Sequence, residues 1–206
     1  RRPSSESGDL PVPSRSPSTA LILVDVINSF FDPRGGAYYP EANAVLPAVR
    51  QLLEAAREAD AFIVHAVERH FPGVRDDEHQ QLPEHCVTGS HDAEYVPGFE
   101  VLSGPREVEL PKRRFSSFLG TDLDFILRAN GVTGVLIVGV KTNVCVRATC
   151  QDAFGHGYAV FVCREATNSN RPHLAEASLE DIDRYMGRVI DLEAATALIT
   201  GAMSDG

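Results

Sequence analysis

The chain has 206 residues, of which 43% are hydrophobic and 23% charged, a balance that suits one globular domain with a buried core rather than two full domains. Its formal net charge of −10 disfavours a nucleic-acid or anionic-membrane partner, because both require a basic surface. Four cysteines without zinc-ribbon spacing, a polar opening segment and apolar runs too short to cross a bilayer favour free thiols in a reducing cytoplasm.

Residues 1–18 are rich in Ser, Pro and Arg and predict a flexible arm before a single domain over residues 19–206. Short apolar runs rich in branched side chains then predict six strands, and apolar residues at helical spacing predict helices between them. The strands are expected at 19–26, 61–67, 107–111, 134–140, 159–163 and 189–192. The helices are expected at 43–59, 122–129, 142–154, 174–185 and 193–200.

This alternation of strands and helices predicts an α/β fold, a Rossmann-like three-layer α/β/α arrangement around a mostly parallel six-stranded sheet. The segment from Glu68 to Gly104 breaks the pattern, because it is long and irregular. Loops of that length in a compact domain are usually functional. Since ligands of such folds bind outside the carboxyl ends of the strands, polar residues at those ends are the candidates for chemistry.

Three such residues follow three of the predicted strands. Asp25 closes the first strand, Lys112 follows the third, and Cys145 lies just beyond the fourth, in the first turn of a helix. Each alone has an ordinary interpretation, as a loop brace, a surface charge and a small core residue. Together they form a reactive set, because a helix N-terminus and an ammonium favour the thiolate. A carboxylate in reach can take the thiol proton and later return it to a departing amine.

The sequence resembles the isochorismatase-like cysteine hydrolases, which include nicotinamidases, N-carbamoylsarcosine amidases and ureidoacrylate hydrolases. The resemblance covers roughly residues 19–200, and its most specific part is the block GVKTNVCVRAT at 139–149. An aspartate in LILVDVINSFFD and a lysine in KRRFSSFLGTDLDFIL stand in the order that this family shows.

The resemblance implies that Asp25, Lys112 and Cys145 form a catalytic triad that cleaves the C–N bond of a small carbamoyl, ureido or amide substrate through a thioester. It also implies a cis peptide between Val140 and Lys141, with the N–H groups of Lys141 and Cys145 forming an oxyanion hole. Isochorismatases proper cleave a vinyl ether and lack the nucleophilic cysteine, so the presence of Cys145 disfavours that activity.

The resemblance leaves a metal site open. Nicotinamidases hold a metal through an Asp-x-His pair and a later His that precedes a Cys, and this chain has Glu68-Arg69-His70 and then His85-Cys86. Because Glu replaces Asp and the rest of the first block differs, we expect no required metal or other cofactor. If zinc is bound, Glu68, His70 and His85 are its candidate ligands.

Residues for substrate binding are less sharply indicated. Phe30 and Val140 are candidates for the pocket wall, and Arg69, Lys141 and Arg147 are candidates for holding a substrate carboxylate. Lys141 is the most suggestive, because the family usually has a small or neutral residue there. The expected partner is a small molecule, and the resemblance implies a homodimer or homotetramer.

Three other functions stay open. The first is a metal-assisted amidase of the nicotinamidase type, and the second is a non-catalytic family member that acts as a binding or scaffold protein. The third is a thiol redox sensor that uses Cys145 and Cys150, although their spacing within one helix is poor for a disulfide. An intact triad disfavours a scaffold, which has no need of all three groups.

Overall fold

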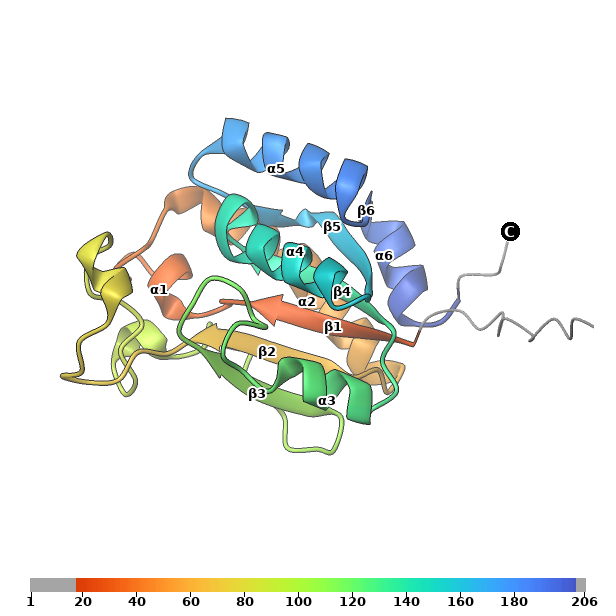
Figure 1. The fold of residues 1–206 in the computed structure, drawn as a ribbon, viewed down its shortest axis with the longest axis horizontal. Helices are drawn as coiled ribbons and strands as arrows, with labels where there is room; N and C mark the ends of the chain where they lie inside the picture. The colour runs from red at the N-terminus through yellow and green to blue at the C-terminus, as the bar shows by residue number, and fades with distance from the viewer. Residues whose placement is uncertain (1–17, 203–206) are drawn as a thin grey trace, which may run out of the picture.

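The computed structural model describes residues 18–202, so all of the predicted arm at residues 1–18 except its last residue lies outside the described residues, as does the stretch 203–206. Six parallel strands form the middle layer in the order β3-β2-β1-β4-β5-β6 (Figure 1). They are β1 (Thr19–Val24), β2 (Ile63–Glu68), β3 (Glu107–Lys112), β4 (Gly134–Val140), β5 (Ala159–Asn168) and β6 (Arg188–Ile190). The predicted α/β architecture with six strands is confirmed.

Helices cover both faces of this sheet. In Figure 1, α3, α4 and α5 lie in front of the sheet, and α2 and α6 lie behind it. The helices are α1 (Asn28–Phe31), α2 (Leu46–Glu58), α3 (Leu123–Ala129), α4 (Arg147–Gly155), α5 (Pro172–Tyr185) and α6 (Leu192–Ile199). Three short 3₁₀ helices, η1 (Pro40–Val45), η2 (Asp77–Gln80) and η3 (His91–Ala93), and one π-helical turn, η4 (Thr142–Val146), complete the elements.

The continuous apolar sequences of the central strands follow from burial on both faces. Along β1, Leu21 and Leu23 join the apolar cluster under α2 and α6, whereas Ala20 and Ile22 join the one under α3, α4 and α5. Because successive side chains of a strand point to opposite faces, each central strand contributes to both clusters. The two cores hold the carboxyl ends of the strands in fixed positions.

Four departures from the predicted elements occur near those carboxyl ends. The first strand ends at Val24 rather than at residue 26, because Asp25 has a left-handed backbone with φ of 55°. Strand β5 continues to Asn168, past a register shift opposite Ile137 and Gly139 of β4. The helix predicted at 142–154 begins with the π-helical turn η4, and α1 was not predicted.

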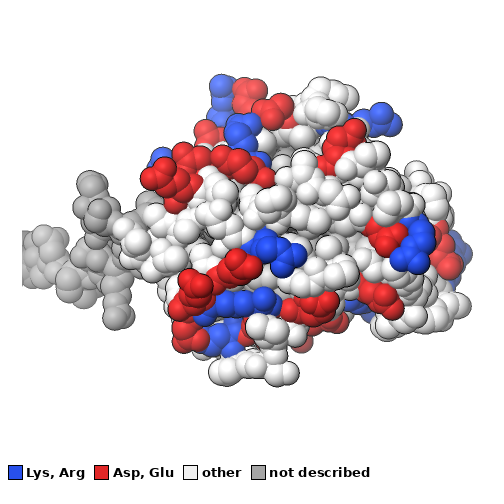
Figure 2. Space-filling model, turned by 180° about the vertical axis from the view of Figure 1, so that it is seen from behind, with Lys and Arg blue, Asp and Glu red and all other residues white. Residues whose placement is uncertain are grey.

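The loop predicted to be functional folds over the carboxyl ends of the strands, which point to the left in Figure 1. Between residues 69 and 104 it contains only η2 and η3 and short isolated bridges. No helix among residues 18–202 is long and apolar enough to cross a membrane. On the face seen in Figure 2, basic side chains lie scattered among acidic ones rather than in one patch.

Candidate active site

Asp25 lies where the backbone leaves the sheet. Its N–H still donates to Ala66 O of the neighbouring strand, and its carboxylate Oδ1 accepts a 2.8 Å hydrogen bond from Glu68 N. These bonds fix the aspartate against β2 although its own strand has ended. The side chain is fully buried.

Lys112 and Cys145 meet this carboxylate from two other strand ends. Lys112 is the last residue of β3, and its Nζ forms a 2.8 Å ion pair with Asp25 Oδ2 and lies 3.6 Å from Cys145 Sγ. The lysine is 1% exposed and the cysteine 3%, so water screens neither contact. The structure therefore brings the three predicted side chains together at one edge of the sheet.

Burial controls the proton on Cys145. Desolvation raises the pKa of its thiol well above the ordinary value, although Lys112 acts in the opposite direction. Burial likewise opposes the charge of Lys112, but Asp25, Cys145 and Glu68 together raise its pKa. These directions favour a lysine ammonium beside a protonated thiol rather than the thiolate expected from the helix terminus, and burial also raises the pKa of Asp25.

The turn that presents Cys145 is shaped by the end of β4. The Val140–Lys141 peptide is cis, as the resemblance implied, and η4 follows it. Just before it, Gly139 has φ of 106°, and a Cβ there would lie 2.0 Å from Val24 O. Only glycine permits this approach of β4 to β1, which places the Cys145 turn next to Asp25.

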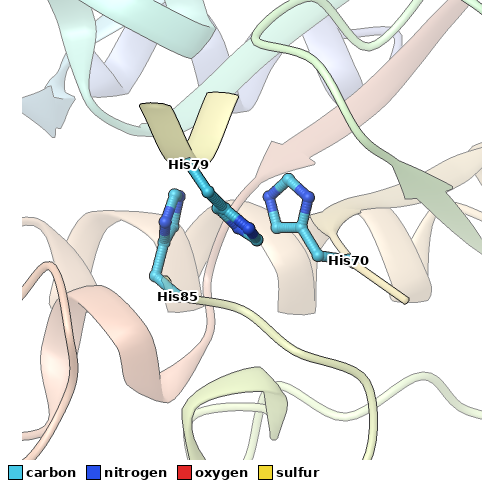
Figure 3. A group of neighbouring side chains, drawn as sticks. All are labelled: His70, His79 and His85. Atoms are coloured by element: carbon cyan, nitrogen blue, oxygen red, sulfur yellow. The ribbon is translucent and has the colours of Figure 1, made fainter. Parts of the chain in front are cut away.

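A second group of polar side chains surrounds Glu68, the last residue of β2. Its Oε1 lies 2.9 Å from both His70 Nε2 and His85 Nε2, and its Oε2 lies 3.8 Å from Lys112 Nζ. Burial opposes the charged form of this carboxyl, but Lys112, His70 and His85 hold its pKa well below the usual range. His79 from η2 joins the two histidines, with its ring centroid 4.4 Å from that of His70, and Figure 3 shows the three rings gathered together.

This histidine cluster, comprising Glu68, His70, His79 and His85, fits a divalent metal. One nitrogen from each histidine lies within 4.8 Å of the others, and Glu68, His70 and Glu78 form an overlapping group of the same size. Imidazole nitrogens and carboxylate oxygens are the donors that Zn²⁺ takes in proteins. The buried His79 Nε2 has no hydrogen-bond partner within residues 18–202, and coordination to a metal would satisfy it, while Glu78 Oε2 lies 3.5 Å from His70 Nε2.

Sequence reasoning proposed three of these donors and missed His79 and Glu78. A signal was present, because three histidines occur between positions 70 and 85 within the irregular segment. It missed Asp76 as well, whose Oδ2 lies 3.1 Å from His70 Nδ1 and whose Oδ1 accepts a 2.9 Å bond from Arg114. A carboxylate on the far nitrogen of a histidine fixes the ring orientation of a metal ligand.

Cys145 opens into a pocket of about 400 Å³. Its polar lining consists of Glu68, His85, Lys141 and Cys145, which joins the triad and the histidine cluster in one space. The apolar lining comprises Phe30, Ala37, Leu82, Pro83, Phe115 and Val144. Phe30 and Lys141 therefore lie where a substrate-binding residue must lie.

The other three candidates for substrate binding do not line this pocket. The guanidinium of Arg69 lies 3.5 Å from Glu109 and stacks over Tyr95, in a separate hollow. Arg147 forms a 3.1 Å ion pair with Asp181 on α5. Val140 is fully buried in the core under α2 and α6.

The chain matches one protein family and is similar to several solved structures. The family model described as Isochorismatase domain matches residues 19–194. A pyrazinamidase of Pyrococcus horikoshii, solved in complex with zinc, is 33% identical, with 85% of this chain and 99% of that chain covered and a TM-score of 0.76.

Two further solved structures are similar over comparable lengths. An N-carbamoylsarcosine amidase from Thermoplasma acidophilum is 28% identical, with 85% of this chain and 96% of that one covered and a TM-score of 0.75. A nicotinamidase/pyrazinamidase from Bacillus subtilis is 26% identical, with 84% and 99% covered and a TM-score of 0.79. The similar structures thus include amidases with different substrates.

Proposed function

The chain belongs to the isochorismatase family of hydrolases, and on that premise we propose that it is a cysteine amidohydrolase that cleaves the C–N bond of a small amide, carbamoyl or ureido substrate. One observation carries the proposal: Asp25, Lys112 and Cys145 meet within 3.6 Å of Lys112 Nζ beside a pocket of small-molecule size.

The first half-reaction forms a thioester. Asp25 takes the proton from Cys145 Sγ, and the thiolate attacks the carbonyl carbon, while the nearby Lys112 ammonium stabilises the sulphur anion before attack. The N–H groups of Lys141 and Cys145 serve as the oxyanion hole for the tetrahedral intermediate. The C–N bond then breaks, and the leaving nitrogen takes the proton from Asp25 and departs as ammonia or an amine.

The second half-reaction regenerates the thiol. Asp25, again a carboxylate, deprotonates a water molecule, and the hydroxide attacks the thioester carbon. The C–S bond breaks, the product leaves as an acid, and the proton on Asp25 returns to the thiolate of Cys145. Lys112 stays charged throughout, because Asp25 and Glu68 hold its pKa high.

A metal-assisted form of this reaction is the second part of the proposal. Glu68, His70, His79 and His85 would hold a divalent ion in the pocket wall, with Asp76 orienting His70. When bound, the ion would supply a Lewis-acid contact for a polar atom of the substrate. The observation that favours it is the convergence of three imidazoles and Glu68, together with the buried His79 Nε2 that has no hydrogen-bond partner among residues 18–202.

The proposal is tested by measuring ammonia release from nicotinamide, N-carbamoylglycine, biuret and ureidoacrylate, together with mass spectrometry of the quenched enzyme. We expect turnover of at least one compound and an acyl adduct on the peptide that contains Cys145. Metal analysis of protein purified without added zinc should give close to one equivalent. Silence on every compound with a chemically reactive Cys145 would favour a binding or scaffold role.

A further inference from the structure

Lys141 brings a second ammonium group to the Cys145 pocket. The whole sequence contains two lysines, Lys112 and Lys141, and every other cationic side chain apart from histidine is an arginine. Both lysines therefore belong to the same small site. A lysine presents a compact charge with three donors, whereas arginine presents a wide planar fork, so the two are not interchangeable in a confined pocket.

The two lysines differ in their partners. Lys112 forms ion pairs with Asp25 at 2.8 Å and Glu68 at 3.8 Å. Within residues 18–202, Lys141 has no carboxylate within the 4.0 Å of an ion pair. It is half-buried in a pocket whose remaining wall is largely apolar, so its charge is poorly compensated by the protein.

Aromatic rings hold the Lys141 side chain in place. Its Nζ lies 5.8 Å from the Phe30 ring centroid and 5.3 Å from that of Tyr39, at cation–π distances. Tyr39 is itself fixed, because its hydroxyl donates a 2.7 Å hydrogen bond to Asn168 Oδ1. The ammonium is thus oriented before any ligand arrives, and the rings cannot neutralise its charge.

Neighbouring groups strengthen the positive character of this end of the pocket. Burial lowers the pKa of Lys141, and the charge of Arg171 lowers it further, while Cys145 and Glu68 act in the opposite direction. Arg171 stands at the N-terminus of α5, and the structure gives it no ion pair among residues 18–202. An anion bound here would relieve both the desolvation and the repulsion.

We infer that the substrate carries a carboxylate, which Lys141 binds while the scissile amide carbonyl lies at Cys145. This inference rests on the proposed function and narrows it to small amides or ureides that are also acids. The carboxylate accepts a charge-assisted hydrogen bond from Lys141 Nζ, and the carbon skeleton packs against Phe30 and Phe115. Lys141 is a specificity-determining residue in this arrangement.

The test compares acids with neutral amides of the same skeleton: succinamate with succinamide, and N-carbamoylglycine with its amide. For the wild type we expect kcat/KM to favour the acid by ~30-fold or more, the range of a hydrogen bond to a charged group. Lys141→Met should remove this preference, so that the ratio of kcat/KM for the acid to that for the neutral amide falls by a similar factor whatever the change common to both substrates, with Lys141→Arg intermediate. Arg147→Met, two residues beyond Cys145 but outside the pocket, is the matched control.

Binding to Cys145→Ala, measured by calorimetry, separates this inference from the proposed function. Tighter binding of succinamate than of succinamide, lost in Lys141→Met/Cys145→Ala, supports the inference even if no amide is cleaved. Equal use or equal binding of acid and amide by the wild-type pocket overturns it, and the amidase proposal then stands or falls on ammonia release alone. Failure of both acids to bind overturns it as well.

Discussion

The triad and the histidine cluster are neighbours that reach one pocket through Cys145 and through Glu68 and His85, but they are built in different ways. Asp25 and Lys112 occupy strand ends, and main-chain bonds such as Glu68 N to Asp25 Oδ1 and Arg69 N to Lys112 O fix the surrounding backbone. His79 and His85 lie in the loop at 69–104, where the His85 ring is held by a side-chain contact with Glu68 and the His79 N–H donates to Asp76 O.

The two regions differ in how many independent interactions hold each side chain in place. A strand end is held by the register of the sheet and by two apolar cores, so changing one side chain there should alter chemistry without moving its neighbours. A loop cluster held by a few hydrogen bonds depends on each of them. We therefore expect substitutions in the triad to affect activity most, and substitutions around the cluster to affect ligand affinity.

The sharpest test of the triad compares two thiols on the same chain segment. Cys145→Ala should lower kcat/KM for any accepted substrate by about 10⁴-fold or more while leaving the melting temperature nearly unchanged, because it removes only the nucleophile. Cys150→Ala is the matched control, since Cys150 lies on α4 and is fully buried in the apolar cluster beneath that helix. Full activity in the Cys145 variant, measured by ammonia release, would remove the nucleophile assignment.

The Asp25–Lys112 pair tests whether the strand-end region is as robust as its backbone suggests. Lys112→Met leaves a fully buried carboxylate without its cation and should cost about 3–5 kcal/mol in the free energy of unfolding. Activity should fall by roughly 10²-fold or more. The double variant Asp25→Asn/Lys112→Met should regain much of the stability but none of the activity. Urea unfolding of the wild type and the two variants measures the free energy of unfolding. A Lys112→Met protein as stable as the wild type would contradict the prediction.

The loop cluster is tested through Asp76, whose carboxylate contacts His70 and whose main-chain O accepts a separate hydrogen bond from His79 N. Asp76→Asn should weaken Zn²⁺ affinity by about 10–100-fold, because the histidine loses the carboxylate that orients it. The carboxylate of its neighbour Asp77 contacts Arg75 and Gln80 at the exposed surface, so Asp77→Asn is the control. Competition with a chromophoric chelator gives both constants. Equal affinities would mean that the loop backbone alone positions His70.

The smallest expected effect concerns His65, which forms a histidine–carboxylate pair between β2 and β3. Its Nε2 lies 2.7 Å from Glu107, yet burial lowers its pKa below the ordinary 6.5. The unfolded chain therefore binds this proton more readily, so His65 contributes stability above about pH 6.5 that is lost as the pH falls below it.

His65→Gln should flatten this part of the pH profile by under about 1 kcal/mol between pH 7.5 and 5.5. Urea unfolding at the two pH values measures the change. If the variant loses more stability than the wild type when the pH falls, the pKa of His65 is not lowered in the folded protein.

The strand-end residues could be predicted from sequence because their positions follow from the fold class. Once LILVD and VLIVGV are assigned to parallel strands, Asp25 and Cys145 must lie at the same edge of the sheet. The left-handed backbone of Asp25 and the π-helical turn at Cys145 could not be predicted, since both arise from packing between strand ends rather than from local propensity.

The loop was the weakest part of the prediction for a related reason. Its hydrogen bonds join residues that no periodic pattern relates, such as Asp76 with Arg114 and Glu68 with His85. His79 and Glu78 therefore gave no spacing by which to assign them. The side-chain direction of Arg69, toward Glu109 and away from Cys145, depends on the neighbouring strand β3 in the same way.

Gly139 limits how this enzyme can be redesigned. Any side chain at that position would collide with Val24 O, so the strand ends beneath the Cys145 turn, the floor of the site, cannot be altered there without separating β1 from β4. The rim has no such constraint, because Leu82 and Phe115 are partly exposed and pack from loops. Libraries aimed at a new substrate should therefore vary the rim and keep the floor constant.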